Sequence, residues 1–352
     1  MTNNCLKCYY SIIPVGNMQD DWLEIRYYQQ FVEFPTHIIQ EVNMSNNELM
    51  KQLGNRMEEQ GFRWRMVSAE HVEELKEEIF RRKRSGEIAE EVYREYLTGF
   101  ETAVADALPG ARSIIVTAVP QPRYQVGFTR DGEVHYFTIP PTYLHHTDQV
   151  VGSLLKSVLE PSGYRFSRAL LPAKLLTVRS GLGRYGRNNI TYIEGIGSFF
   201  RLRAYYTDLP CQQDHWQSAE VMDICKNCHA CVDGCLAGAI SRERFTVQAD
   251  KCITFFSELD IPWPPWVESC WDKDSKCLVG CMKCQLNCPK NRENRNRVES
   301  LAVFSQQETG ILLKEKERVR LPVDLVEKLE RLCLAEYIPI LSRNLHILFQ
   351  AA

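Results

Sequence analysis

Two runs of closely spaced cysteines constrain this chain of 352 residues more than any other feature. The first run, CKNCHACVDGC, occupies 225–235 and has the spacing C-x2-C-x2-C-x3-C. The second run, CLVGCMKCQLNCP, occupies 277–289 and contains C-x2-C-x3-C-P. The sequence holds 14 cysteines, most of them within 211–288. Short spacings of this kind, without a recognisable export signal, indicate a metal or cluster site rather than disulfides.

The spacing of the two runs predicts a pair of [4Fe–4S] clusters that take their ligands crosswise. A C-x2-C-x2-C loop offers three thiolates to one cluster, and the next cysteine of the run ligates the other cluster. The first cluster is expected to bind Cys225, Cys228, Cys231 and Cys288. The second is expected to bind Cys235, Cys281, Cys284 and one further cysteine. Zinc sites more often combine two cysteines per block with a long spacer, so zinc is disfavoured.

Two cysteines compete for the last position on the second cluster. Cys277 would extend the second run to C-x3-C-x2-C, whereas Cys252 lies between the runs in ADKCITFF. Spacing alone leaves both open, and Cys252 is preferred partly on the family resemblance described below. The remaining cysteines are expected to pack as small buried side chains; they are Cys5, Cys8, Cys211, Cys270 and Cys333, with Cys277 if it is no ligand.

Helical and strand-like patterns interleave without a strict β-α-β rhythm, which predicts an α+β fold. Apolar residues three and four apart predict helices, and these are expected just after Met44, within 68–107, near 147–160 and 168–180, and over 307–350. Runs of β-branched residues predict strands at 111–120 and 134–141, and the segment 190–209 alternates like a hairpin.

Shifts in pattern divide the chain into four parts. These are an N-terminal extension (1–43), an α+β domain (44–214), a cysteine-rich domain (215–300) and C-terminal helices (301–352). The extension contains Cys5-x2-Cys8, which would need two further ligands to bind zinc.

Charge and hydropathy exclude several classes of function. The formal net charge of −3 gives no electrostatic reason to bind nucleic acid or an acidic membrane surface. No apolar run approaches the roughly 20 residues that span a bilayer. The N-terminal residues show no signal peptide, and Arg81-Arg82 lies within a helical pattern, so twin-arginine export is not expected. We therefore expect a cytoplasmic protein.

The segment GLGRYG (181–186) matches the G-x-G-x-x-G pattern of dinucleotide-binding loops, but its context does not. Such a loop follows a strand and opens a helix. Here a helical pattern precedes it, and the β-branched segment NNITYIEGIGSFF follows. We interpret it as a helix C-cap with a tight turn, or as a glycine loop that lets backbone approach a large planar cofactor.

Several segments follow one another in a specific order over roughly 105–292. They are LPGARSIIVTAVP, VRSGLGRYGRNNITYIEGIGSFFRLRAYYTDLPC, the first cysteine run, CITFFSEL and GCMKCQLNCPKN. This set resembles epoxyqueuosine reductase and, more distantly, the reductive dehalogenases. The resemblance implies a nitroreductase-like domain that holds base-off cobalamin, here 44–214, and a ferredoxin-like domain with two [4Fe–4S] clusters, here 215–300. The family's second cluster uses a cysteine in a C-I-S segment, which favours Cys252.

Two departures from the family pattern affect the expected function. The family's aspartate, the proposed proton donor, aligns with Ser167, and no carboxylate lies nearby in YRFSRALLPAK. The helical repeat that the family uses on tRNA is not recognisable after LSRNLHILF, so a role on nucleic acid is not expected.

The resemblance thus implies a divergent cobalamin-dependent reductase, in which the second cluster passes electrons to cobalt. Candidate proton donors are Tyr185, Lys174 and Arg184, with Arg187 as a further possibility. Expected cofactor contacts are Gly183, Gly186, Arg187 and Asn188. The alternative is a non-catalytic ferredoxin-like protein that reduces a partner, such as a corrinoid protein. Either would draw electrons from a low-potential donor such as ferredoxin or flavodoxin; an enzyme would then reduce a small molecule or a corrinoid protein.

Overall fold

The computed structural model describes residues 45–100, 107–271 and 276–351. The expected extension with Cys5 and Cys8 lies outside the described residues. The described part mixes helices and strands, as the α+β prediction requires. None of its helices combines the length and apolar character needed to cross a bilayer.

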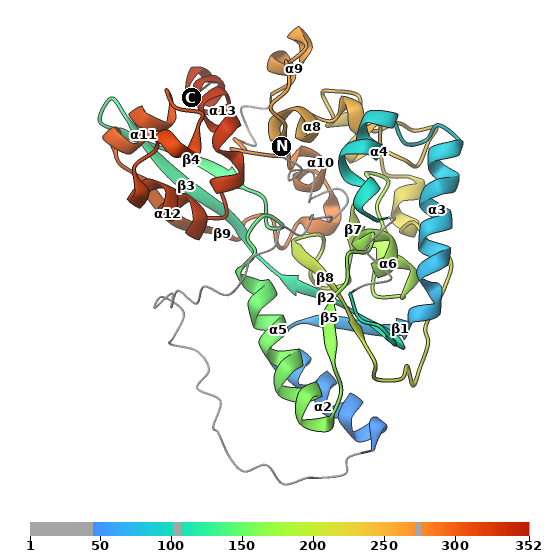
Figure 1. Cartoon of the computed structure of the whole chain (residues 1–352). Helices are drawn as coiled ribbons and strands as arrows, with labels where there is room; N and C mark the ends of the chain where they lie inside the picture. The colour runs from blue at the N-terminus through green and yellow to red at the C-terminus, as the bar shows by residue number, and fades with distance from the viewer. Residues whose placement is uncertain (1–44, 101–106, 272–275, 352) are drawn as a thin grey trace.

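A four-stranded antiparallel sheet of order β1-β2-β8-β5 forms the centre of the fold (Figure 1). Its strands are β1 (Arg63–Ser68), β2 (Ser113–Pro120), β8 (Phe200–Thr207) and β5 (Phe166–Arg168). β2 pairs with β8 from Ser113–Thr207 to Pro120–Phe200, and every residue of β8 is buried. Both faces of these strands are covered, which explains why β2 has apolar residues on both faces, interrupted only by Ser113 and Thr117.

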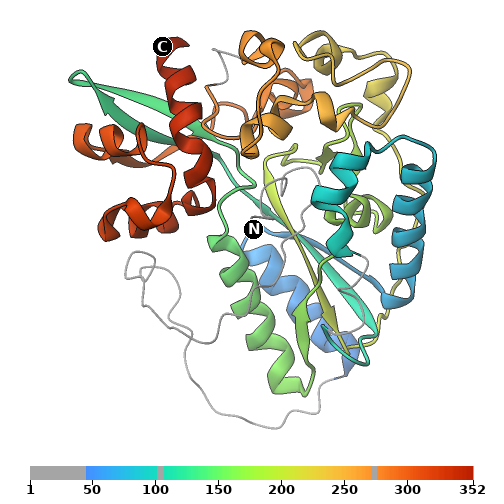
Figure 2. The ribbon, with the colours of Figure 1, turned by 45° about the horizontal axis from the view of Figure 1, so that its top comes forward.

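Alternate residues of β2 face two different apolar clusters. Ile115 and Val119 pack with helices α2 (Asn46–Glu59) and α5 (His146–Leu159). Ile114 and Val116 belong to a larger cluster on the other face. That cluster includes residues of α3 (Val72–Arg84), α4 (Glu90–Tyr96) and α6 (Ala173–Arg179). Figures 1 and 2 show these two helix groups on opposite sides of the sheet.

The expected helix after Met44 is confirmed as α2, and its start has a local cause. Ser45 is the N-cap, and its side chain and that of Glu48 form a reciprocal capping box. Such a box satisfies two backbone N–H groups that the first helical turn leaves without partners.

The C-terminal segment joins the first half of the chain through a second sheet of order β4-β3-β9. Its strands are β3 (Arg123–Arg130), β4 (Glu133–Ile139) and β9 (Val298–Phe304), and β9 runs parallel to β3. Helices α11 (Gln306–Leu312), α12 (Val323–Arg331) and α13 (Ile338–Ala351) follow. β9 crosses the boundary expected at residue 300, between the cysteine-rich domain and the C-terminal helices. The division of the chain into four parts remains a prediction.

Two sequence expectations are wrong. The segment 190–209 is not a hairpin, because β7 (Thr191–Tyr192) pairs with β6 (Arg184–Tyr185), while β8 pairs with β2 and β5. The helix expected over 168–180 begins only at Ala173, because β5 and Pro172 precede it. Strands β1 and β3 were not expected, although β3, with the sequence RYQVGFTR, carries an apolar residue at every second position from Tyr124 to Phe128.

In its described residues, the cysteine region consists of loops, short 3-10 turns and four short α-helices. These are α7 (Ala230–Asp233), α8 (Ile253–Glu258), α9 (Pro265–Cys270) and α10 (Lys283–Leu286). α13 fixes this region from outside, because buried Asn344 donates to the carbonyls of Ser257 and Leu278, both at 2.9 Å. Arg343 donates to three further carbonyls beside α8.

We predict that Asn344→Ala lowers the free energy of unfolding by about 2–4 kcal/mol, because it leaves two buried carbonyls without a donor. Urea denaturation measures the effect. Gln350→Ala, at an exposed position of the same helix, serves as control and should change stability by less than about 0.5 kcal/mol. Equal stability of both variants would contradict the assigned role of Asn344.

Candidate functional site

Four cysteines from three segments surround one cavity in the cysteine region. The cavity is lined by Cys235, Cys252, Cys281 and Cys284, together with Cys270 and apolar residues such as Ala239 and Ile240. Cys277 does not line it, and packs instead with Phe199 and Met282. It still lies near Cys281, because both Cys252 and Cys277 add to the effect of burial in raising the pKa of Cys281. The Cys270 thiol donates to the Leu236 carbonyl at 3.5 Å.

A second group of thiols gathers around the first run. Burial raises the pKa of Cys231 to about 11, and the nearby Cys225, Cys288 and Cys228 raise it as well. Burial also raises the pKa of Cys225, again with contributions from Cys288 and Cys228. Cys288, the last cysteine of the second run, therefore lies among the three cysteines of the first.

The two runs approach each other closely at Gly234, where an added side chain would force its neighbours to shift. Gly234 stands between α7 and Cys235, and a Cβ atom there would lie 1.9 Å from the Asn287 side-chain nitrogen. It would also lie 3.1 Å from the Ala230 carbonyl oxygen. The glycine thus allows the contact between α7 and α10 that brings the runs together.

The donor set fits a cluster of iron and sulfide. Burial raises the pKa values of Cys281 and Cys284, and neighbouring thiols raise them further, so these groups are neutral thiols at pH 7 without a metal. A bound metal must therefore displace their protons. Four thiolates around a cavity are the ligands of a [4Fe–4S] cluster. Within the described ranges, no three His, Cys, Asp or Glu side chains are grouped for a single metal ion.

The glycine loop at 181–186 packs against its own chain. It follows α6, with Gly181 at φ +71° as the helix ends, and it leads into the β6–β7 ribbon. A Cβ on Gly183 would lie 2.7 Å from the Tyr192 carbonyl, and one on Gly186 would lie 2.5 Å from Asn188 Oδ1. The loop neither follows a strand nor opens a helix, which confirms that it is no dinucleotide fingerprint.

Asn188 and Tyr192 lie between the two thiol groups. Asn188 Nδ2 donates to the Tyr192 hydroxyl at 2.9 Å, and the Asn188 side chain also hydrogen-bonds Cys284. Burial raises the pKa of Tyr192 well above its usual value, helped by Cys288 and Cys284 and by a hydrogen bond to Cys288. Sequence reasoning selected Asn188 but missed Tyr192, since nothing local connects Tyr192 with a cysteine 96 positions away.

Arg187 likewise faces the thiol groups. Its guanidinium donates to the backbone carbonyls of Cys225 and Arg242. Two of the four expected cofactor contacts, Arg187 and Asn188, therefore touch the segments that carry the cysteines.

The three candidate proton donors lie apart. Tyr185 is buried and packs edge-on against Phe245, with ring centroids 5.1 Å apart. Arg184 is exposed and pairs with Glu220 and Asp223. Lys174 alone lines a cavity beside the second thiol group.

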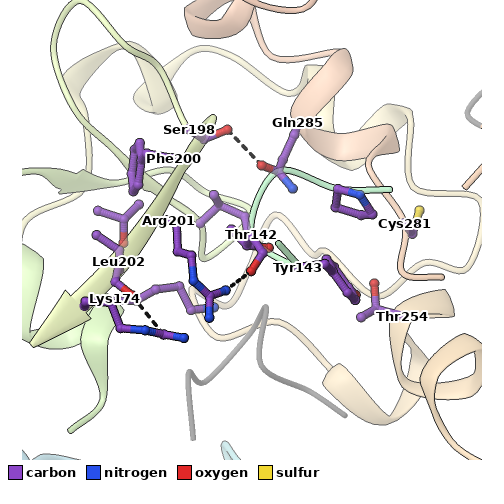
Figure 3. A pocket seen from close by; sticks show the side chains of 14 residues that line it. Thr142, Tyr143, Lys174, Ser198, Phe200, Arg201, Leu202, Thr254, Cys281 and Gln285 are labelled. Carbon is purple, nitrogen blue, oxygen red and sulfur yellow. Dashed lines mark hydrogen bonds between the residues drawn. The ribbon is translucent and has the colours of Figure 1, made fainter. Parts of the chain in front are cut away.

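That cavity, of about 50 Å³, lies between β8 and the second run (Figure 3). Lys174 and Arg201 occupy one side and Cys281 the other. Arg201 and Arg203 are only 3% and 7% exposed, and both pair with Asp148. A second hollow of about 900 Å³ is open to solvent and includes Gly183, Arg184, Asp223 and Lys290 in its lining.

Comparisons with known proteins agree with the resemblance seen in the sequence. No family model matches. An epoxyqueuosine reductase from Cellulophaga algicola is 30% identical over 156 residues, which is 44% of this chain and 48% of the relative. The enzyme from Staphylococcus aureus is 28% identical over 217 residues, covering 56% of this chain and 54% of the relative. The chain thus spans about half the length of these curated relatives.

Solved structures extend the likeness in fold over most of the chain. Epoxyqueuosine reductase from Streptococcus thermophilus aligns with a TM-score of 0.59 at 17% identity, covering 86% of this chain and 81% of that one. A structure with an epoxyqueuosine-modified tRNA-Tyr stem loop aligns at 0.63 and 17% identity, covering 87% and 82%. A reductive dehalogenase aligns at only 0.35, which supports no argument. The chain is therefore similar to epoxyqueuosine reductases in sequence over part of its length and in fold over most of it.

Proposed function

We propose that this protein is an iron–sulfur oxidoreductase that moves electrons through two [4Fe–4S] clusters. The observation that carries the proposal is the exchange of cysteines between the runs. Cys288 lies among the cysteines of the first run, and Cys235 lines a cavity with Cys281 and Cys284 of the second. This is the crossed arrangement that two-cluster ferredoxins use.

The proposed ligand sets follow from these two groups. The first cluster is held by Cys225, Cys228, Cys231 and Cys288. The second is held by Cys235, Cys252, Cys281 and Cys284. The clusters supply one-electron transfer, while the chain holds the thiolates and buries four of them, Cys225, Cys231, Cys252 and Cys284. Electrons would enter from a low-potential donor of the ferredoxin or flavodoxin class.

The resemblance implies a cobalamin as well, but the cavity beside the second cluster does not fit one. Pockets for drug-sized ligands measure about 300–1,000 Å³, and a corrinoid is larger than such ligands. The cavity between Cys281 and β8 measures about 50 Å³, and buried Arg201 and Arg203 are among its lining residues. The 900 Å³ hollow has room, yet of the four expected cofactor contacts only Gly183 lines it. No step of the proposal therefore passes through a corrinoid.

Two candidate functions fit an iron–sulfur oxidoreductase of this kind. The first is a reductase that acts on a small molecule, because the relatives are named reductases. The second is delivery of electrons to a partner protein, which the poor fit between the cavity and a corrinoid supports. Of the expected proton donors, Lys174 is the one we assign to the reduction of a small molecule, because it lines the same cavity as Cys281. Ser167, where the resemblance would place the family's aspartate, lies on β5 and pairs with Tyr206.

The ligand assignment predicts unequal effects of three alanine variants on metal content. Cys252→Ala should lower the iron content of anaerobically purified protein by about four atoms per chain, the complement of one cluster. Cys277→Ala and Cys270→Ala should leave it unchanged, and they control for the loss of a nearby thiol. Iron and sulfide assays measure the outcome. If the iron loss follows Cys277 or Cys270, or if the protein holds zinc, the assignment is wrong.

The size of the cavity predicts that the protein retains no stoichiometric corrinoid. Anaerobic protein with intact clusters is mixed with hydroxocobalamin, separated by gel filtration and examined by absorbance. The iron–sulfur spectrum should elute without corrinoid bands. Retention of one base-off corrinoid per chain would instead restore the cobalamin-dependent reductase as the function.

The position of Tyr192 predicts that Tyr192→Phe makes the reduction potential of the first cluster more negative. The hydroxyl hydrogen-bonds Cys288, and losing it removes stabilisation from the more negatively charged, reduced cluster. One hydrogen bond of about 0.5–1.5 kcal/mol corresponds to about 20–60 mV for one electron. Redox titration followed by EPR measures the shift, and Tyr185→Phe is the matched control. Equal potentials in the Tyr192 variant and the wild type would remove Tyr192 from this role.

A further inference from the structure

Three buried polar groups around the cavity beside Cys281 have no hydrogen-bond partner. They are the Tyr143 hydroxyl, the Thr191 hydroxyl and the Arg203 Nε. Their residues are 2%, 1% and 7% exposed, and all three line the same cavity. More than about nine in ten buried polar groups in proteins have a partner, so three unpaired groups at one cavity require an explanation.

The chemistry of the three groups favours an acceptor as the missing partner. A guanidinium N–H can only donate, and a hydroxyl can donate as well. Three cationic side chains line the cavity, Lys174, Arg201 and Arg203, whereas none of the described lining residues is Asp or Glu. Both guanidinium groups pair with the one carboxylate of Asp148, which is not among the lining residues.

The site is preformed by packing around the hydroxyls. A Cβ on Gly280, the residue before Cys281, would lie 2.5 Å from the Tyr143 hydroxyl, so glycine leaves the room that this group occupies. The Tyr143 ring packs against Tyr337 with centroids 5.8 Å apart. The hydroxyl is therefore held beside the second cysteine run.

We propose that this cavity binds a small oxyanion, such as a carboxylate or an inorganic oxyanion of a few heavy atoms. Its volume of about 50 Å³ exceeds the about 10–15 Å³ that one water needs, which suits a ligand of a few heavy atoms. Hydrogen bonds from Tyr143, Thr191 and Arg203 satisfy the anion, and Lys174 and the two arginines balance its charge. The anion lies next to Cys281, a ligand of the proposed second cluster. Binding itself requires only the folded chain, so its failure would leave the iron content and the proposed electron transfer unaffected.

The test uses full-length protein purified without oxygen, at constant ionic strength. Acetate and sulfate are the probes, and acetamide is the neutral control for acetate. We expect one or both anions to raise Tm and to bind with a stoichiometry of one in calorimetry, while acetamide does neither. Acetate alone would identify a carboxylate site, and sulfate alone a tetrahedral oxyanion site. If neither anion binds, the cavity holds only water and the proposal is overturned.

Two isosteric variants test the site without opening a hole in the core. Tyr143→Phe and Thr191→Val should each weaken anion binding about tenfold or more, because a hydrogen bond to a charged group is lost. Without anion their Tm should stay equal or rise, since each removes an unpaired buried hydroxyl. Tyr206→Phe and Thr309→Val are matched controls, because these hydroxyls are also buried and unpaired but line no part of this cavity. Equal affinity in all four variants, or equal weakening in all four, would overturn the proposal.

Discussion

The structure depends on the contact between two cysteine runs that begin about 50 positions apart. Gly234 lies at the contact between α7 and α10, where a Cβ atom would force the Asn287 side chain to move, and this contact mixes the cysteines of the two runs. Half of the eight proposed ligand thiols are buried and the other half are partly buried. They lie close to one another, and burial holds several of them in the neutral form. Proton loss from so many neighbouring thiols is unfavourable unless positive charge replaces the protons. Metal binding and correct packing of this region are therefore two aspects of one equilibrium.

The polar residues between the two cysteine runs connect metal binding to the packing of the α+β part as well. The β6–β7 ribbon supplies Asn188 and Tyr192, which hydrogen-bond Cys284 and Cys288, and Arg187 holds the carbonyl of Cys225. Interactions of this kind orient ligands and adjust the electronic properties of a metal site. The glycine loop that resembles a nucleotide-binding motif leads into this ribbon, and Gly183 and Gly186 allow the loop to pack closely against it.

The sequence predicts features that depend on residues within one segment. It misses features that depend on pairing between strands far apart in the chain. The helix at α2 and the strand at β2 follow from a capping box and a β-branched run. β9 was missed because it pairs with β3, about 175 positions earlier, and its own alternation is weak. The candidate thiol groups could be proposed because ligand spacing is a local signal. The cationic cavity had a usable signal that was not recognised: Arg201 and Arg203 are two apart on one strand, so they share a face.

The anchoring of the cysteine region by α13 has a consequence for the order in which the protein matures. Both cysteine runs leave the ribosome before the residues that pair with the carbonyls of Ser257 and Leu278 have been translated. Until Asn344 and Arg343 arrive, the backbone around α8 lacks donors that the finished protein supplies. Cofactor assembly during synthesis would therefore meet an unfinished scaffold until Arg343 and Asn344 have left the ribosome and packed against this region.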